Sequence, residues 1–172
     1  MQLILKAFLD LLLLRKGPED IPKSSLLLAM VIGLAVAVNM LFYTAVETDY
    51  ETDQFLEFAI ELVKIVSYLI VLLLFGVMNR ATQTFTAIIA CNAILGLLMT
   101  VVLILSQPLT DKSLDAALAW LITIWLILVE GHIISRAIQL HWVTGIAIAV
   151  VIFILQLGSF YYFGELPEGA VG

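Results

Sequence analysis

Charged residues are scarce in this chain of 172 residues, because Asp, Glu, Lys and Arg together make up only 13% of it. A typical soluble domain carries about 25%. The apolar set AVILMFWYC reaches 63%, and the mean hydropathy is +1.13. One core of a small domain cannot bury so much apolar surface, which excludes a water-soluble enzyme and a disordered tail. The net charge of -6 argues against a nucleic-acid partner, because polyanion binding needs basic surfaces.

Cysteine and histidine are nearly absent as well. Cys91 is the only cysteine, which excludes an internal disulfide and a cysteine-based zinc site. The two histidines form no His-Glu-x-x-His pair, and the chain has neither a Gly-x-Ser-x-Gly elbow nor a phosphate-binding glycine loop. We therefore expect a protein that is not an enzyme, with no catalytic residues, no metal site and no cofactor.

Five long apolar stretches dominate the sequence instead. A membrane-spanning helix needs about 20 mostly apolar residues, and the stretches lie at 25–46, 55–78, 85–105, 116–134 and 140–163. They lack the alternation of a membrane β-barrel. The sequence predicts an all-α membrane protein with a five-span helix bundle at 25–163, an N-terminal segment at 1–24 and a short outer tail at 164–172. The break at 135–139 is the weakest, and one long helix is the alternative there.

The N-terminal segment 2–16 is too short to span a membrane. Its polar and apolar residues separate onto two helical stripes, with Gln2, Lys6 and Asp10 on one and Leu5, Phe8, Leu9 and Leu12 on the other. This pattern is typical of an amphipathic helix at the membrane interface, ended here by Gly17-Pro18. Packing of the same helix against the bundle is the alternative.

Lysine and arginine are distributed unequally between the two sides of the predicted bundle. One side has only Lys112, whereas the other has Lys6, Arg15, Lys16, Lys23, Arg80 and Arg136. Basic residues accumulate on the cytoplasmic side of membrane proteins. The bias therefore predicts a cytoplasmic N-terminus and an outer C-terminus, with the lipid bilayer as the main partner.

Small residues recur at helical spacing in three of the stretches. Because they let helices approach closely in lipid, they mark helix interfaces: Ser25, Ala29, Gly33 and Ala37; Thr86, Ala90, Ala93, Gly96 and Thr100; Gly145 and Ala149. Packing within the monomer is the preferred interpretation, and a homo-oligomer interface is the alternative. The amides of Asn39, Asn92 and Gln156 are expected to cross-link helices by hydrogen bonds rather than to bind a ligand.

Charged residues within the spans are candidate functional groups, because an ionised side chain in hydrocarbon costs from about 3 kcal/mol upward unless it finds a partner. Glu57, Glu61 and Lys64 share one face of the second stretch, and Lys64 can pair with Glu61 in the outer third of the span. An ion or substrate path and a neutralised pair are both open interpretations.

A second polar group lies near the inner end of the fourth stretch. Glu130 and His132 are two residues apart and point in different directions, which is poor spacing for one metal site. Arg80 and Arg136 are expected at similar depth, where either could neutralise Glu130. The group is either a cytoplasm-facing, proton-linked polar pocket or a set of charges satisfied at helix ends.

The layout resembles the Ypt-interacting-protein (Yip) membrane family in its short bacterial form. The residues that carry the resemblance are Phe75-Gly76, Thr84-Phe85-Thr86, Ala90-Cys91-Asn92, Trp125, Gly131 and Ser135-Arg136-Ala137. The third stretch departs from the family pattern, because Gly96-Leu97 stands where a proline is expected. The resemblance implies five spans, the bacterial inner membrane, and no catalytic residues to carry over.

These observations lead to two functional hypotheses. The first is a non-enzymatic scaffold or accessory subunit that acts by helix–helix contacts with itself or with a larger membrane complex. The second is a small transporter or proton-linked permease subunit that uses Glu61, Lys64, Glu130 and His132. Transport predicts a water-accessible cavity at Glu61 or Glu130, whereas carboxylates that are paired and enclosed by apolar side chains would exclude it.

Overall fold

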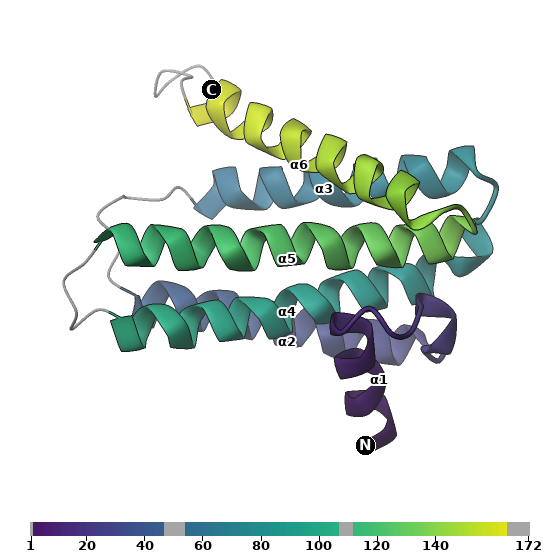
Figure 1. Cartoon of the computed structure of the whole chain (residues 1–172), viewed down its shortest axis with the longest axis horizontal. Coiled ribbons are helices and arrows are strands. Elements are labelled where there is room, and N and C mark those ends of the chain that lie inside the picture. Colours follow the sequence, from purple (N-terminus) through teal and green to yellow (C-terminus); the bar gives the residue numbers. More distant parts are fainter. Residues whose placement is uncertain (1, 47–53, 107–111, 165–172) are drawn as a thin grey trace.

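The computed structural model describes residues 2–46, 54–106 and 112–164, and the regular structure within them is entirely helical. The elements are α1 (Gln2–Leu12), the 3-10 turn η1 (Pro18–Asp20), α2 (Ser25–Ala45), α3 (Gln54–Leu74), the 3-10 turn η2 (Met78–Arg80), α4 (Ala81–Ser106), α5 (Lys112–Ile138) and α6 (Trp142–Gly164) (Figure 1). The all-α fold is thus confirmed. Residues 165–172 of the predicted tail, and residues 47–53 and 107–111 between predicted spans, lie outside the described residues.

Four of these helical segments are long and apolar enough to cross a membrane. They are Ser25–Ala45, Met78–Ser106, Asp115–Ile138 and Trp142–Phe163. α3 is as long as α2, at 21 residues. It is not among the four because it carries three charged residues, Glu57, Glu61 and Lys64. The described residues therefore contain four apolar helices of spanning length, as a helical membrane protein has, and α3 is a further, more polar helix of similar length.

Consecutive long helices run in opposite directions along one bundle, so α2 and α4 both begin at the same end (Figure 1). α2 packs mainly on α4, α4 on α5, α5 on α6, and α6 on α3. Figure 1 shows these five helices running along the long axis of the molecule, whereas α1 runs across that axis at one end. The same end holds η1, the turn between α3 and α4, and the turn between α5 and α6. We call it the basic end, after Lys6, Arg15, Lys16, Lys23, Arg80 and Arg136.

Two turns at the basic end have clear backbone causes. α3 ends at Leu74, four residues before the predicted boundary, because Gly76 adopts a left-handed φ of 67° that Gly tolerates without strain. α5 continues to Ile138, beyond the predicted end at 134, and stops where Gln139 has a φ of 58°. α5 and α6 are therefore separate helices, and the alternative of one long helix is wrong.

α1 packs against the bundle through one face. It ends at Leu12, and Leu14 turns the chain at a φ of 59°, so the predicted end at Gly17-Pro18 is wrong. The predicted apolar stripe is divided between two environments, because Phe8 and Leu12 are buried with Ala7 and Leu11, whereas Leu5, Leu9 and Leu13 are exposed. Packing against the bundle is thus confirmed for the buried face, and a second leucine face is left uncovered by the described residues.

The contact between α5 and α6 is close enough to require glycine on both helices. A Cβ atom on Gly145 would lie 2.1 Å from the carbonyl oxygen of Gly131 and 2.6 Å from Cβ of Ser135. A Cβ atom on Gly131 would lie 2.7 Å from Cα of Ile146. Backbone therefore packs directly on backbone here, as small residues allow in membrane helices. The predicted packing role of Gly145, and of the buried Ala149 one turn later, is confirmed.

The other two small-residue stripes differ, because the one on α4 is buried and the one on α2 is exposed. The stripe on α4 packs within the monomer as predicted, because Thr86, Ala90, Ala93 and Thr100 are buried. A Cβ atom added to Gly96 would lie 3.4 Å from Cγ1 of Val38 on α2. The stripe on α2 does not, because Ser25, Ala29, Gly33 and Ala37 are all exposed. The prediction of packing within the monomer is wrong for α2. This helix buries Val31 and Val38 toward α4 and turns its small residues outward.

The intramembrane amides do not cross-link helices as predicted. Asn39 is exposed, and its Nδ2 donates to the carbonyl oxygen of Ala35 on its own helix at 3.2 Å. Oδ1 of Asn92 is buried without a hydrogen-bond partner. Backbone carbonyls one turn earlier satisfy several hydroxyls in the same way, as at Thr86 and Thr100. Polar side chains of the described spans thus bond mostly within their own helix.

Candidate functional site

A charge cluster joins α3 and α5 inside the bundle. Nζ of Lys64 lies 2.8 Å from Oε1 of Glu61, three residues earlier on α3, and 3.7 Å from Oε1 of Glu130 on α5. The hydroxyl of Tyr68 donates to Oε2 of Glu130 at 2.7 Å. We call Glu61, Lys64, Tyr68 and Glu130 the mid-span cluster. The predicted pairing of Lys64 with Glu61 is confirmed.

The members of this cluster differ sharply in exposure. The side chains of Lys64 and Glu130 are 8% and 7% exposed, and Tyr68 is fully buried. Glu61 is 48% exposed and forms the outer edge of the cluster. One ammonium thus lies between a buried carboxylate and a half-exposed one. Burial of an unpaired charge is strongly unfavourable, so the pairing of Lys64 and Glu130 is what permits either of them in the interior.

The cluster lies at the middle of α3 and in the last third of α5. Lys64 precedes the end of α3 by 10 residues, and Glu130 precedes the end of α5 by 8. At 1.5 Å per residue these separations are about 15 Å and 12 Å from the basic end. Lys64 is therefore at the middle of its helix rather than in the predicted outer third, because α3 ends earlier than predicted. Glu130 lies toward the basic end of α5, as predicted, but about two turns from that end because α5 ends later than predicted.

The predicted pairing of Glu130 with Arg80 or Arg136 is also wrong. Nη1 of Arg80 donates to the carbonyl oxygen of Ala137 at 3.3 Å, near the end of α5. Arg136 pairs with Glu19 of η1. Since α5 runs on to Ile138, Arg136 is carried about 9 Å along the helix beyond Glu130. Lys64 supplies the positive charge near Glu130 and Tyr68 supplies a hydrogen bond to it. The i,i+4 position of Tyr68 after Lys64 was the sequence signal that could have identified Tyr68 as a member of the cluster.

His132 contacts the N-terminal segment and does not form a polar group with Glu130. Its Nε2 lies 2.9 Å from the carbonyl oxygen of Lys16. Gln83 of α4 acts similarly, because its Nε2 donates to the carbonyl oxygen of Ile21 at 2.7 Å. Ile21 itself is buried. These two side chains tie the segment between α1 and α2 to the bundle.

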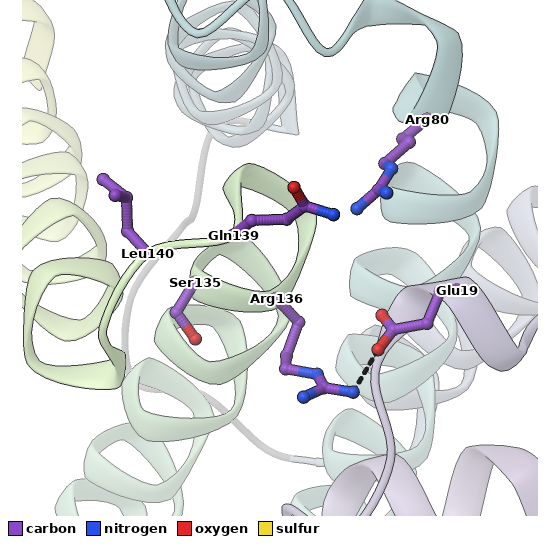
Figure 2. Close-up of a pocket in the computed structure, with 6 residues that line it drawn as sticks. All are labelled: Glu19, Arg80, Ser135, Arg136, Gln139 and Leu140. Carbon is purple, nitrogen blue, oxygen red and sulfur yellow. Dashed lines mark hydrogen bonds and ion pairs between the residues drawn. The ribbon is translucent and has the colours of Figure 1, made fainter.

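A polar cavity of about 360 Å³ opens at the basic end, and we call it the end pocket. Figure 2 shows its lining residues, which are Glu19, Arg80, Ser135, Arg136, Gln139 and Leu140. The predicted polar pocket at Glu130 and His132 is therefore wrong, because this cavity is lined by Arg80 and Arg136 but by neither of those two residues. A second cavity of about 410 Å³ lies between α3 and α6 and has mainly aliphatic walls, from Ile70 to Leu155. Neither Glu61 nor Glu130 lines either cavity.

Residues 2–46, 54–106 and 112–164 contain no group of three or more His, Cys, Asp or Glu side chains that could hold a metal ion. Cys91 is fully buried in α4. The arrangement offers instead a partly buried cluster of one ammonium and two carboxylates, and a basic cavity at one end.

Comparisons with protein families, with curated proteins and with solved structures found no match. The resemblance to the Yip family stays a prediction.

Proposed function

We propose that this chain is a non-enzymatic, polytopic membrane protein that acts as a scaffold or accessory subunit through helix–helix contacts. The observation that carries the proposal is the outward-facing stripe of small residues on α2. Ser25, Ala29, Gly33 and Ala37 are exposed, and an added Cβ on Gly33 meets no atom within 4 Å. Small residues at four-residue spacing provide little packing area against lipid but allow another helix to approach closely.

Asn39 is a second exposed feature of α2, about 120° around the helix axis from Gly33. Its side chain is exposed on the same helix, and its amide has one bond, to a carbonyl of its own helix. An amide in contact with lipid gains from a second helix that can hydrogen-bond to it. The simplest occupant of the face is a second copy of this chain, since two such stripes are complementary to one another around a twofold axis.

The proposed topology has five spans, with α3 as the fifth. Pairing of Lys64 with Glu61 and Glu130 lowers the cost of carrying charge across hydrocarbon. The proposed orientation places the basic end in the cytoplasm and the C-terminus outside, by the positive-inside rule. In this orientation α1 lies across the bundle at the bilayer surface, and its exposed Leu5, Leu9 and Leu13 enter the interface. The proposed location is a bacterial inner membrane.

A matched pair of glycine variants tests the scaffold role. Gly33 on α2 and Gly158 on α6 both have open space around an added Cβ. We expect the full-length protein to form a dimer in lipid nanodiscs by mass photometry. Gly33→Leu should shift it to the monomer, and Gly158→Leu should leave it dimeric. A wild-type monomer with no co-purifying membrane protein, or equal effects of the two variants, would contradict the proposal.

Proton-linked transport is the second candidate, and one observation favours it. Lys64 contacts both the half-exposed Glu61 and the buried Glu130, so the three side chains form a continuous polar path from the surface into the interior. Proteoliposomes with an internal pH-sensitive dye test this hypothesis. Transport predicts acidification under an imposed potential that Glu61→Gln abolishes. Two observations favour the scaffold role over transport: Glu130 is buried, and no residue of the mid-span cluster lines either cavity.

A further inference from the structure

The end pocket is assembled from segments that are far apart in the chain. η1 contributes Glu19, η2 contributes Arg80, the last turn of α5 contributes Ser135 and Arg136, and the turn before α6 contributes Gln139 and Leu140. Side chains from separate elements therefore converge on one space of about 360 Å³ (Figure 2). Such convergence of a few polar groups on a concave space is the usual form of a small-ligand site.

The polar lining of this pocket has an excess of donors. Two guanidinium groups face a single carboxylate, and each guanidinium carries five N–H donors. Arg80 donates to the carbonyl oxygen of Ala137, and Arg136 pairs with Glu19. Figure 2 shows the amide end of Gln139 turned toward the guanidinium of Arg80 across the pocket. Positive charge and spare donors aimed into one space suit a ligand that is anionic and rich in acceptors.

The ion pair between Glu19 and Arg136 is weak. The two side chains are 37% and 54% exposed, and an ion pair between exposed side chains contributes little. Glu19 lies on a short 3-10 turn, and its carboxylate can yield to a stronger acceptor without any change in a long helix. The carboxylate therefore acts as a competitor that a phosphate group, with more acceptors and charge, can displace.

The surroundings of the pocket identify the ligand as a lipid. The pocket lies at the end of the bundle where apolar spans give way to polar turns, which is the depth of phospholipid headgroups. Leu140 lines the pocket and is 44% exposed, and Trp142 two residues later is 56% exposed. Exposed apolar and aromatic side chains beside a basic pocket suit acyl chains next to a bound headgroup.

We propose that the end pocket binds the phosphate group of an anionic phospholipid between Arg80 and Arg136, with Glu19 as its internal competitor. The acyl chains lie along the apolar surface at Leu140 and Trp142. The proposal is independent of the scaffold role, because its residues are at the basic end and not on the exposed face of α2.

Native mass spectrometry of the full chain in a non-ionic detergent tests this site. Phosphatidylglycerol is the probe, phosphatidylcholine is the neutral control lipid, and inorganic phosphate tests whether the tails are needed. We expect phosphatidylglycerol to bind more tightly than phosphatidylcholine. Arg80→Gln and Arg136→Gln should each weaken binding by about tenfold, because each removes charged hydrogen bonds to the phosphate. Inorganic phosphate alone should bind far more weakly than the lipid.

Two further variants make the result decisive. Arg15→Gln removes the same charge from an exposed site at the basic end that is outside the pocket, and it should leave binding unchanged. Glu19→Gln removes the competitor and should strengthen binding, so it tests the site even where an arginine variant fails to fold. Equal weakening by Arg15→Gln would indicate general charge attraction and overturn the proposal. Weaker binding by Glu19→Gln, or inorganic phosphate binding as tightly as the lipid, would also overturn it.

Discussion

The backbone contact between α5 and α6 makes a sharp prediction about stability. Gly145→Ala adds a Cβ atom 2.1 Å from the carbonyl oxygen of Gly131 and 2.8 Å from the backbone nitrogen of Ser135. Real Cβ atoms essentially never approach within 3.0 Å, and backbone atoms cannot rotate out of the way. The two helices must therefore separate by about 1 Å, which is an overpacking strain of about 1–3 kcal/mol, toward the upper end because no side chain can yield.

Gly158→Ala is the matched control on the same helix. An added Cβ at Gly158 meets no atom within 4 Å. Ala is favoured over Gly in helices by about 1 kcal/mol, so this variant should be neutral or slightly more stable than the wild type. Both variants gain the same propensity, and the difference between them, about 1–3 kcal/mol, isolates the strain.

Unfolding by SDS titration in mixed micelles, followed by circular dichroism, measures these free energies. The expected order of stability is Gly158→Ala, then wild type, then Gly145→Ala. Gly131→Ala adds a Cβ to the same contact from the other side, so the double variant should lose less than the sum of the two single losses. If Gly145→Ala were as stable as Gly158→Ala, the close approach of α5 and α6 would be refuted.

Three further predictions concern the polar contacts. Lys64→Met should lower the free energy of unfolding by about 3–5 kcal/mol because it leaves the buried Glu130 unpaired, and adding Glu130→Gln should recover much of that loss in the same SDS titration. Tyr68→Phe removes the hydroxyl bond to Glu130 and should lower it by about 1–3 kcal/mol; an unchanged value would exclude that bond. Gln83→Ala releases the carbonyl of Ile21, so hydrogen exchange should rise at residues 13–24 while the remainder of the bundle keeps its protection.

Much of the helical layout could be predicted from runs of apolar residues, because their length alone identifies spanning helices. The orientation of each helix about its axis could not. In water, an apolar stripe points to the core, but lipid is as apolar as the core and removes that signal. The exposed stripe on α2 and the buried stripe on α4 therefore look alike in sequence. Only the structure distinguishes Gly33, in open space, from Gly96, against Val38.

The candidate site was predictable only where its contacts are local. The pair of Glu61 and Lys64 follows from a spacing of three residues on one helix. Tyr68 and Glu130 are 62 residues apart, and no periodicity relates α3 to α5. The partner of Arg136 was mispredicted because α5 continues to Ile138, which places Arg136 near Glu19 and away from Glu130.

The order of the mid-span cluster along the chain has a consequence for biosynthesis. As a fifth span, α3 would emerge from the ribosome with Lys64 and two glutamates, whereas Glu130 follows Tyr68 by 62 residues. At about 5–20 residues per second, several seconds pass before that carboxylate is made. The proposed topology therefore requires α3 to wait at the translocon or the bilayer surface and to insert only once α5 arrives. A nascent chain halted before α5 should leave α3 open to proteases.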